Sequence, residues 1–204
     1  MIAAQLARVR ARLESRPAGL VSHVGRVLTE ATALAGCWDL DEQRVELAVW
    51  GHDLFRAADG AELLRRSLAA KLPVTSSDEQ SPVLLHGPLA AYVLTEDFGV
   101  QDDEVLEAVR AHTLGLGRMS TLAKVILLAD KVETMKRRGE RELQAIRRLA
   151  QRDLDLALLC WADCKLLIER GDGWPSDPRH WKARVTWLEA GRKGLGSVPM
   201  STGE

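Results

Sequence analysis

The first fifty residues alternate apolar and polar positions in a way that predicts amphipathic helices. The pattern over 2–15 predicts a short helix, and Pro17 marks the break before a second helix over about 20–35. Asp39 and Glu42, three positions apart, resemble a capping box, and the helix that follows should end at His52 and Asp53. Leu, Ala, Arg and Glu dominate and β-branched runs are nearly absent, so we expect an all-α fold.

The same signals continue through the rest of the chain. Segment 72–82 is polar and bounded by prolines, which is typical of a flexible surface loop or lid. His86 should precede a helix with Pro in its first turn, and Asp102 should cap a helix that ends near His112. Further helices are expected over the ranges 61–71, 121–138 (capped by Ser120, with Asp130 near its middle), 140–170 and 178–190.

Composition and charge bound the class of protein. A chain of 204 residues with 46% hydrophobic and 28% charged positions suits one folded domain over 1–204 and excludes a disordered chain. We expect a core over about 17–138, a C-terminal helical part over about 140–190 and a flexible tail over 191–204. The formal charge of -1 offers no basic field for nucleic acid or an anionic membrane. Three unpaired cysteines and the absence of a signal peptide or membrane span predict a cytoplasmic protein.

Four of the five histidines fall on separate predicted helices or their ends, whereas His180 lies apart. These four are His23, His52, His86 and His112. Imidazole and carboxylate groups bind divalent metals, and a helical bundle can aim one such group from each helix at a common point. His52 and Asp53 are adjacent and point about 100° apart on a helix, so one can bind a first metal while the other bridges to a second. A carboxylate offers two oxygens where an imidazole nitrogen offers one lone pair, which assigns bridging to Asp53.

The order and spacing of these histidines, His52-Asp53 and Asp130 resemble the HD superfamily of metal-dependent phosphohydrolases. The segments LLHGPLAAYVL and EAVRAHTLGLGRMSTLAKVILLADKVE narrow the resemblance to its YqeK family, which cleaves diadenosine tetraphosphate symmetrically into two ADP. The resemblance runs from about Pro17 to Leu188 and includes RDLDLALL at 152–159. It implies a single HD-type helical bundle with the C-terminal helices packed on it, and an enzyme that hydrolyses phosphoric anhydrides.

The resemblance also implies two divalent metal ions, with iron expected and manganese as the alternative. One ion would take His23, His52, Asp53 and Asp130, and the other would take Asp53, His86 and His112. Two ions lower the pKa of a water molecule between them and neutralise charge on the phosphate under attack. The catalytic residues would be Asp53, His52 and Arg56.

Basic residues near these positions are candidates for contacts to substrate phosphates. The set comprises Arg56, Arg118 and Lys131, with Lys124 as a further neighbour. Arg56 stands where the family usually has Lys, and its bidentate fork can keep that role. Leu20 stands where the family often has Arg and cannot replace a guanidinium. Thr134 replaces the usual Pro, and KARVTWL lacks the usual Arg-Asn pair.

Other readings of these residues remain open at this point. A nucleotide phosphatase or phosphodiesterase of the same superfamily would use the same ligands, as would a diiron oxygenase similar to myo-inositol oxygenase. A non-catalytic nucleotide sensor is a third class, although such proteins often lose a ligand. We expect a nucleotide substrate, no nucleic acid and no membrane as partners, and leave a homodimer open. His180, Cys160 and Cys164 are interpreted as packing residues.

Overall fold

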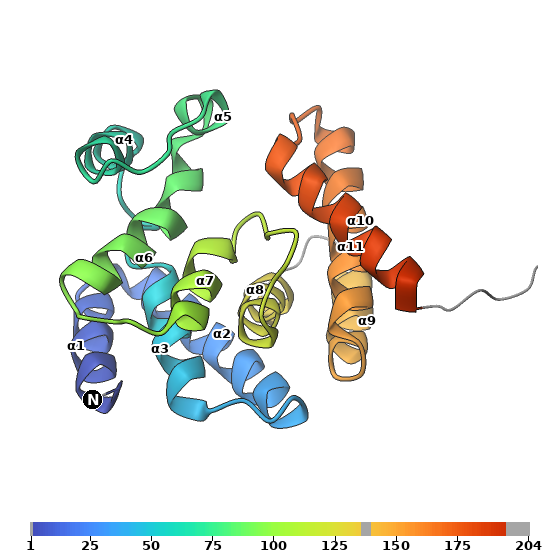
Figure 1. Cartoon of the computed structure of the whole chain (residues 1–204), viewed down its shortest axis with the longest axis horizontal. Helices are drawn as coiled ribbons and strands as arrows, with labels where there is room; N and C mark the ends of the chain where they lie inside the picture. Colours follow the sequence, from blue (N-terminus) through green and yellow to red (C-terminus); the bar gives the residue numbers. More distant parts are fainter. Residues whose placement is uncertain (1, 136–139, 195–204) are drawn as a thin grey trace, which may run out of the picture.

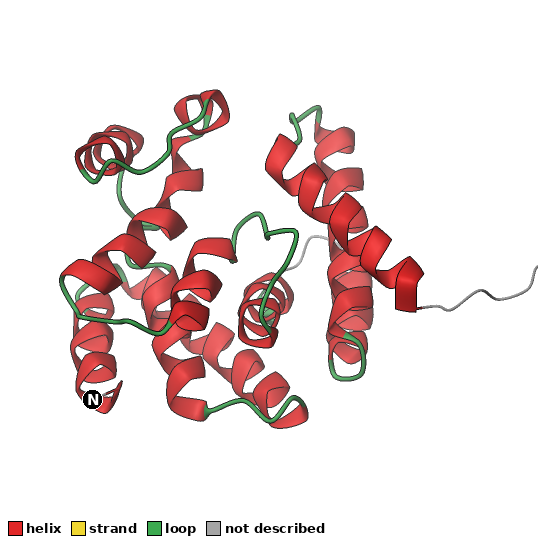
Figure 2. Ribbon diagram, in the orientation of Figure 1, coloured by secondary structure: helices red, strands yellow, loops and turns green. Residues whose placement is uncertain are grey.

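Helices form almost all of the chain that the structure describes, and no strand occurs among these residues (Figure 2). The computed structural model describes residues 2–135 and 140–194. The elements are α1 (Ile2–Glu14), α2 (Ala18–Cys37), α3 (Glu42–His52), α4 (Gly60–Ala69), α5 (Ser76–Gln80), the 3₁₀ turn η1 (Pro82–Leu85), α6 (His86–Glu96), α7 (Asp103–Ala111), α8 (Thr121–Val132), α9 (Glu140–Ala150), α10 (Leu154–Asp172) and α11 (Pro178–Gly194). The all-α expectation is confirmed.

The helices form a bundle with a second helical layer beside it (Figure 1). In the bundle, α3 packs against α1, α2, α6 and α7, and α8 packs against α2 and α7. The layer of α9, α10 and α11 rests on α8 through α9 and α10. A single cluster of buried apolar side chains runs through both parts, from Val24 in α2 to Leu158 in α10 and Trp187 in α11. The metal-binding candidates therefore lie in a bundle braced on one side by the C-terminal helices.

Side-chain caps fix where several of the bundle helices begin. Asp102 accepts hydrogen bonds from the backbone of α7, and Ser120 does so for α8, as the sequence predicts. The expected cap at Asp39 is wrong, because Asp41 accepts the bond from the Arg44 N–H. Asp39 instead has a φ of 50°, a left-handed conformation that Asp tolerates and that turns the chain between α2 and α3. The turn thus displaces the cap by two residues.

Segment 72–82, which the sequence predicts as a flexible surface loop or lid, holds a short helix and a buried carboxylate. It contains the short helix α5, which begins with a capping box between Thr75 and Asp78. The Asp78 side chain is fully buried and receives two hydrogen bonds from the Arg179 guanidinium of α11, at 2.7 and 3.1 Å. This segment is therefore tied to the C-terminal layer.

The C-terminal part departs from the expected helix boundaries. The expected helix over 140–170 is two helices, α9 and α10, because Asp153 caps a new helix after a turn. The helix that carries Asp130 ends at Val132, so Asp130 lies in its last turn, and 136–138 fall outside the described residues. The tail expected over 191–204 begins inside α11, and 195–204 fall outside the described residues.

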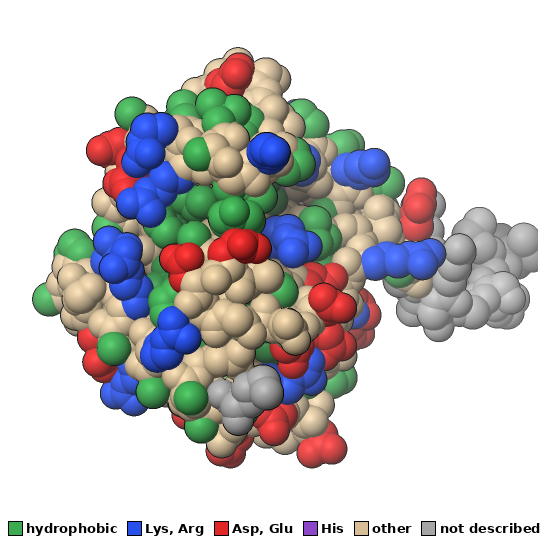
Figure 3. Space-filling view, turned by 60° about the vertical axis from the view of Figure 1, so that its left-hand side comes forward, with side chains coloured by type: hydrophobic (Ala, Val, Ile, Leu, Met, Phe, Trp, Pro, Cys, Tyr) green, Lys and Arg blue, Asp and Glu red, His purple; other side chains and the backbone are tan. Residues whose placement is uncertain are grey.

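Charge and hydropathy agree with the balanced composition. Positive and negative side chains lie next to one another across the face shown in Figure 3. Within the described ranges, no helix combines the length and the apolar character that a membrane crossing requires. A cytoplasmic location and a homodimer stay predictions.

Candidate metal centre

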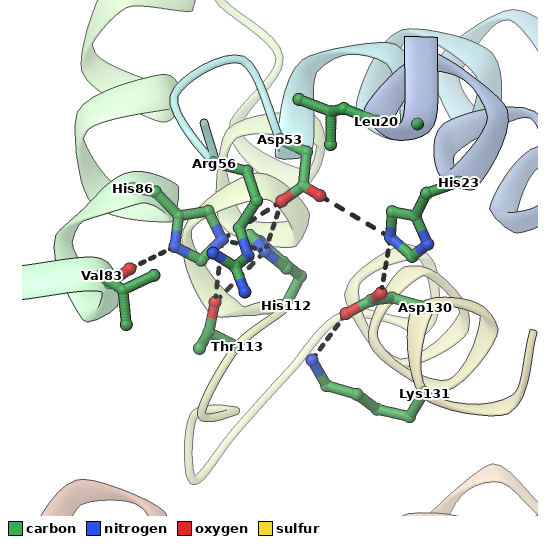
Figure 4. Close-up of a pocket in the computed structure, with 11 residues that line it drawn as sticks. Leu20, His23, Asp53, Arg56, Val83, His86, His112, Thr113, Asp130 and Lys131 are labelled. Atoms are coloured by element: carbon green, nitrogen blue, oxygen red, sulfur yellow. Dashed lines mark hydrogen bonds and ion pairs between the residues drawn. The ribbon is translucent and has the colours of Figure 1, made fainter. Parts of the chain in front are cut away.

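Six side chains from five parts of the fold converge on one centre, and Figure 4 shows five of them, His23, Asp53, His86, His112 and Asp130. His23 comes from the first half of α2, His52 is the last residue of α3 and Asp53 is its C-cap. His86 begins α6, His112 follows α7, and Asp130 comes from α8. All but His23, which is partly exposed, are buried. The structure thus brings together the set that the sequence singles out.

Three of the histidines have their tautomer fixed by the backbone. The Nδ1 atom lies 2.6 Å from the Val49 oxygen in His52 and 2.7 Å from the Val109 oxygen in His112. His86 makes the same contact with the oxygen of Val83. A carbonyl oxygen can only accept, so each Nδ1 carries the proton and each Nε2 presents a lone pair to the centre.

The Asp53 carboxylate divides the histidines into two sets. Its Oδ1 atom lies 3.2 Å from the Nε2 of His86 and 3.5 Å from that of His112. Its Oδ2 atom lies 3.6 Å from the Nε2 of both His23 and His52. The Asp130 Oδ1 atom approaches the His23 Nε2 atom to 3.1 Å and so joins the second set. One carboxylate oxygen faces each set, which is the arrangement that a bridging ligand requires.

These contacts fit a divalent cation because the atoms that face the centre offer more lone pairs than there are protons to share between them. The His86 and His112 Nε2 atoms lie 2.8 Å apart although both carry lone pairs in the tautomer described above. The buried His52 Nε2 atom has no hydrogen-bond partner among the described residues. Within each of two sets, His23–His52–Asp130 and His52–Asp53–His112, the ligand atoms lie within 4.8 Å of one another. Imidazole nitrogens and carboxylate oxygens are ligands for divalent first-row metals, so the site fits such an ion.

Burial favours a neutral imidazole at His112. Burial lowers the pKa of His112 to about 4, more than the nearby Asp53 carboxylate raises it. The neutral imidazole is the state that binds metal, since a ligand must be deprotonated.

Comparison with known proteins now places this arrangement in a family. The family model described as HD domain matches residues 20–135, more than half of the chain. The chain belongs to the HD domain family. It is 36% identical over 140 residues to a symmetrical bis(5'-nucleosyl)-tetraphosphatase of Halalkalibacterium halodurans, covering 67% of this chain and 72% of that protein. The similarly named protein of Bacillus subtilis is 34% identical over 137 residues, with the same coverage.

A solved structure agrees on the fold of this HD protein. It is described as a predicted HD superfamily hydrolase involved in NAD metabolism from Clostridium acetobutylicum. The two folds superpose with a TM-score of 0.84 at 24% identity, over 90% of this chain and 97% of the other. The likeness spans the bundle and the C-terminal layer together.

The HD centre lines a cavity of about 400 Å³ that also holds two of the candidate phosphate contacts. Arg56, Lys131 and Leu20 lie in its wall. Arg118 is exposed and is not among the residues that line this cavity. The Lys131 ammonium donates to Asp130 Oδ2 at 2.6 Å (Figure 4). Lys124 pairs with Asp155 instead. Arg56 is thus the candidate best placed to reach a phosphate.

Two further residues of the HD site are missing from the sequence-based set. Thr113 places its Oγ1 atom 3.2 Å from the His112 Nε2 atom and 3.5 Å from that of His86. A Cβ atom on Gly87 would meet the Val109 oxygen at 2.9 Å and the His112 ring at 3.1 Å. Only glycine leaves room for His112 here. Their positions directly after His112 and His86 are the signal that could have found them.

The residues interpreted as packing lie away from the HD centre. His180 is fully buried between Trp161 and Trp187, with ring centroids at 5.0 and 6.4 Å, and its Nδ1 atom is 2.9 Å from the Leu114 oxygen. Cys160 and Cys164 pack against the core as partly buried free thiols, whose pKa values burial raises. Neither cysteine is therefore activated as a thiolate.

Proposed function

We propose that this protein is a metal-dependent phosphohydrolase that cleaves diadenosine tetraphosphate, or a related dinucleoside polyphosphate, symmetrically to two ADP. The observation that carries the proposal is the Asp53 carboxylate, whose two oxygens face two separate ligand sets. Both relatives described above are named as symmetrical bis(5'-nucleosyl)-tetraphosphatases. Water adds to one phosphorus atom, and the bond to the bridging oxygen between the second and third phosphates breaks.

The ligand sets divide between two ions. His23, His52, Asp53 and Asp130 would hold one ion, and Asp53, His86 and His112 would hold the other. We assign iron to both positions, with manganese as the alternative, because both metals suit a mixed set of imidazole and carboxylate. When bound, such a pair lowers the pKa of water and neutralises negative charge on phosphate oxygens.

The remaining side chains of the cavity bind and orient the substrate. The Arg56 guanidinium lies in the wall and offers paired donors to phosphate oxygens. ADP is a stable anion that needs little protonation as it leaves, so the reaction makes small demands on a general acid. Two further cavities, of about 430 and 500 Å³, meet the first at Thr113 and are lined by Trp174 and Lys165. They give room for nucleoside groups beside the phosphates.

Product analysis tests this function directly. The purified protein is reconstituted with Fe²⁺ under reducing conditions, or with Mn²⁺, and incubated with diadenosine tetraphosphate before ion-exchange chromatography. We expect ADP as the sole product. Equal amounts of AMP and ATP would overturn symmetrical cleavage, and orthophosphate release from mononucleotides in place of ADP formation would support a phosphatase. A requirement for oxygen would support the oxygenase class.

A further inference from the structure

His23 differs from the other three histidines in how its ring is held. His52, His86 and His112 lie at helix boundaries, and each turns its Nδ1 atom to the carbonyl three residues earlier. His23 lies inside α2, where the carbonyls of the preceding turn accept the helical hydrogen bonds. Its Nδ1 atom instead faces the Glu133 Oε1 atom at 3.4 Å. This ring alone among the four depends on a side chain from another helix.

Glu133 is itself held so that one carboxylate oxygen is directed at His23. It is the C-cap of α8 and only 3% exposed. Its Oε2 atom accepts a hydrogen bond from the Arg26 Nε–H at 2.8 Å and another from the Met135 backbone N–H at 2.8 Å. Two donors therefore occupy Oε2 and leave Oε1 for the imidazole. Arg26 lies three residues after His23, so α2 supplies both the ring and the group that anchors its partner.

We propose that Glu133 is a positioning residue for the metal centre: it selects the His23 tautomer with the proton on Nδ1 and aims Nε2 at Asp53 and Asp130. Imidazole ligands of metals commonly donate their second N–H to a carboxylate or carbonyl, and loss of that partner typically weakens metal binding about 10- to 100-fold. The proposal rests on the proposed function, because it presupposes the metal site. It adds that the ion on the His23 side depends on the contact between α2 and α8.

Metal titration without substrate separates this role from an ordinary ion pair between helices. We compare the wild type, Glu133→Ala and Glu133→Gln by titrating the metal-free proteins with Mn²⁺ under calorimetry and electron paramagnetic resonance. Glu133→Ala should lose about 10- to 100-fold in affinity for one ion and keep the other within about twofold. Glu133→Gln, which keeps an acceptor oxygen but not the charge, should lie between. If Glu133→Ala does not fold, Glu133→Gln carries the test.

Glu30→Gln is the matched control. Like Glu133, Glu30 is a largely buried acid. It lies on α2, pairs with Arg147 of α9 at 2.9 Å and lies outside the histidine cluster. Its loss removes an ion pair between helices, so it should alter thermal unfolding while leaving both metal affinities unchanged. Equal metal affinities in Glu133→Ala and Glu30→Gln would overturn the positioning role.

The outcomes also distinguish this inference from the proposed function. One result is that the wild type binds both ions and fails to cleave diadenosine tetraphosphate while Glu133→Ala loses affinity for one ion only. That result would support the positioning role of Glu133 and overturn the assignment of the substrate. A wild type that binds no metal would overturn both. Turnover of Glu133→Ala should recover toward the wild-type kcat at saturating Mn²⁺, which a residue that touches the reacting atoms would not allow.

Discussion

Asp53 and Asp78 are both buried carboxylates, and they differ in what faces them. Asp78 accepts hydrogen bonds from the Thr75 N–H and hydroxyl and from two N–H groups of Arg179. Asp53 faces imidazole Nε2 atoms, which in the tautomers described above carry lone pairs. Asp78 therefore has a cationic side chain and hydrogen-bond donors facing it, whereas the Asp53 cluster needs a bound cation. The comparison separates a structural buried charge from one retained for chemistry.

Replacing Asp53 should have the largest effect on activity. Asp53→Ala removes the group that faces both ligand sets, so we expect loss of both metal ions and at least a thousandfold loss of turnover, about 4 kcal/mol in barrier. Elemental analysis and the chromatographic assay measure the two effects. Turnover near that of the wild type would remove Asp53 from the mechanism.

The isosteric substitution Asp53→Asn should not destabilise the metal-free fold, which sharpens the contrast with Asp78. Asp53→Asn removes a buried charge that has no cationic side chain paired with it, so the metal-free variant should unfold at or above the temperature of the metal-free wild type. Differential scanning calorimetry in excess chelator checks this. A marked drop in unfolding temperature would show that Asp53 is structural as well.

Breaking the Asp78 cluster should have the opposite outcome. Arg179→Met leaves the buried Asp78 carboxylate without its cation, and we expect a loss of about 2 kcal/mol in the free energy of unfolding. Metal content should stay at the wild-type level because this cluster lies outside the histidine set. Denaturant unfolding and elemental analysis together test the prediction, and metal loss at unchanged stability would contradict it.

These two clusters also show how far sequence reasoning reaches. Helix ends carry local signals, such as the caps at Asp102 and Ser120, so the places of His52 and His112 could be predicted from the residues around them. Asp130 could be predicted as a ligand only from the family resemblance, because no local signal in the sequence around it marks a metal site. The pairs Arg26–Glu133 and Asp78–Arg179 join residues 107 and 101 positions apart, and only the packed fold brings them together. The polar residues of 72–82 therefore predict a loop, although Asp78 among them forms a buried ion pair with Arg179.

A smaller effect is expected at His180, which links α11 to the loop after His112. His180→Phe removes the hydrogen bond to the Leu114 oxygen, so it should cost about 1.5 kcal/mol of unfolding free energy without loss of metal. Denaturant unfolding and metal analysis measure this. Loss of metal and turnover comparable to that in Asp53→Ala would show that His180 belongs to the site.

The pH dependence of stability tests the same residue. Burial lowers the pKa of His180, so above about pH 6.5 its contribution is complete, and it is lost as the pH falls toward the folded-state pKa. Between pH 7 and pH 5 the wild type should lose more stability than His180→Phe, with the metal-binding histidines common to both. His180→Asn keeps a donor and should match His180→Phe in pH dependence. Equal slopes in the wild type and His180→Phe would contradict the assignment.

Arg56 should show the smallest effect, because it is exposed at the wall of the cavity and neither buried cluster depends on it. Arg56→Ala should raise KM about fivefold, or about 1 kcal/mol in binding, with metal content and unfolding unchanged. Arg56→Lys should keep part of the effect, because an ammonium supplies the charge but not the paired donors. The difference between wild type and Arg56→Ala should shrink as salt is added, since exposed charges are screened over about 10 Å at 0.1 M. A collapse of kcat at full metal occupancy would instead place Arg56 at the reacting phosphate and move it from the wall of the site into its chemistry.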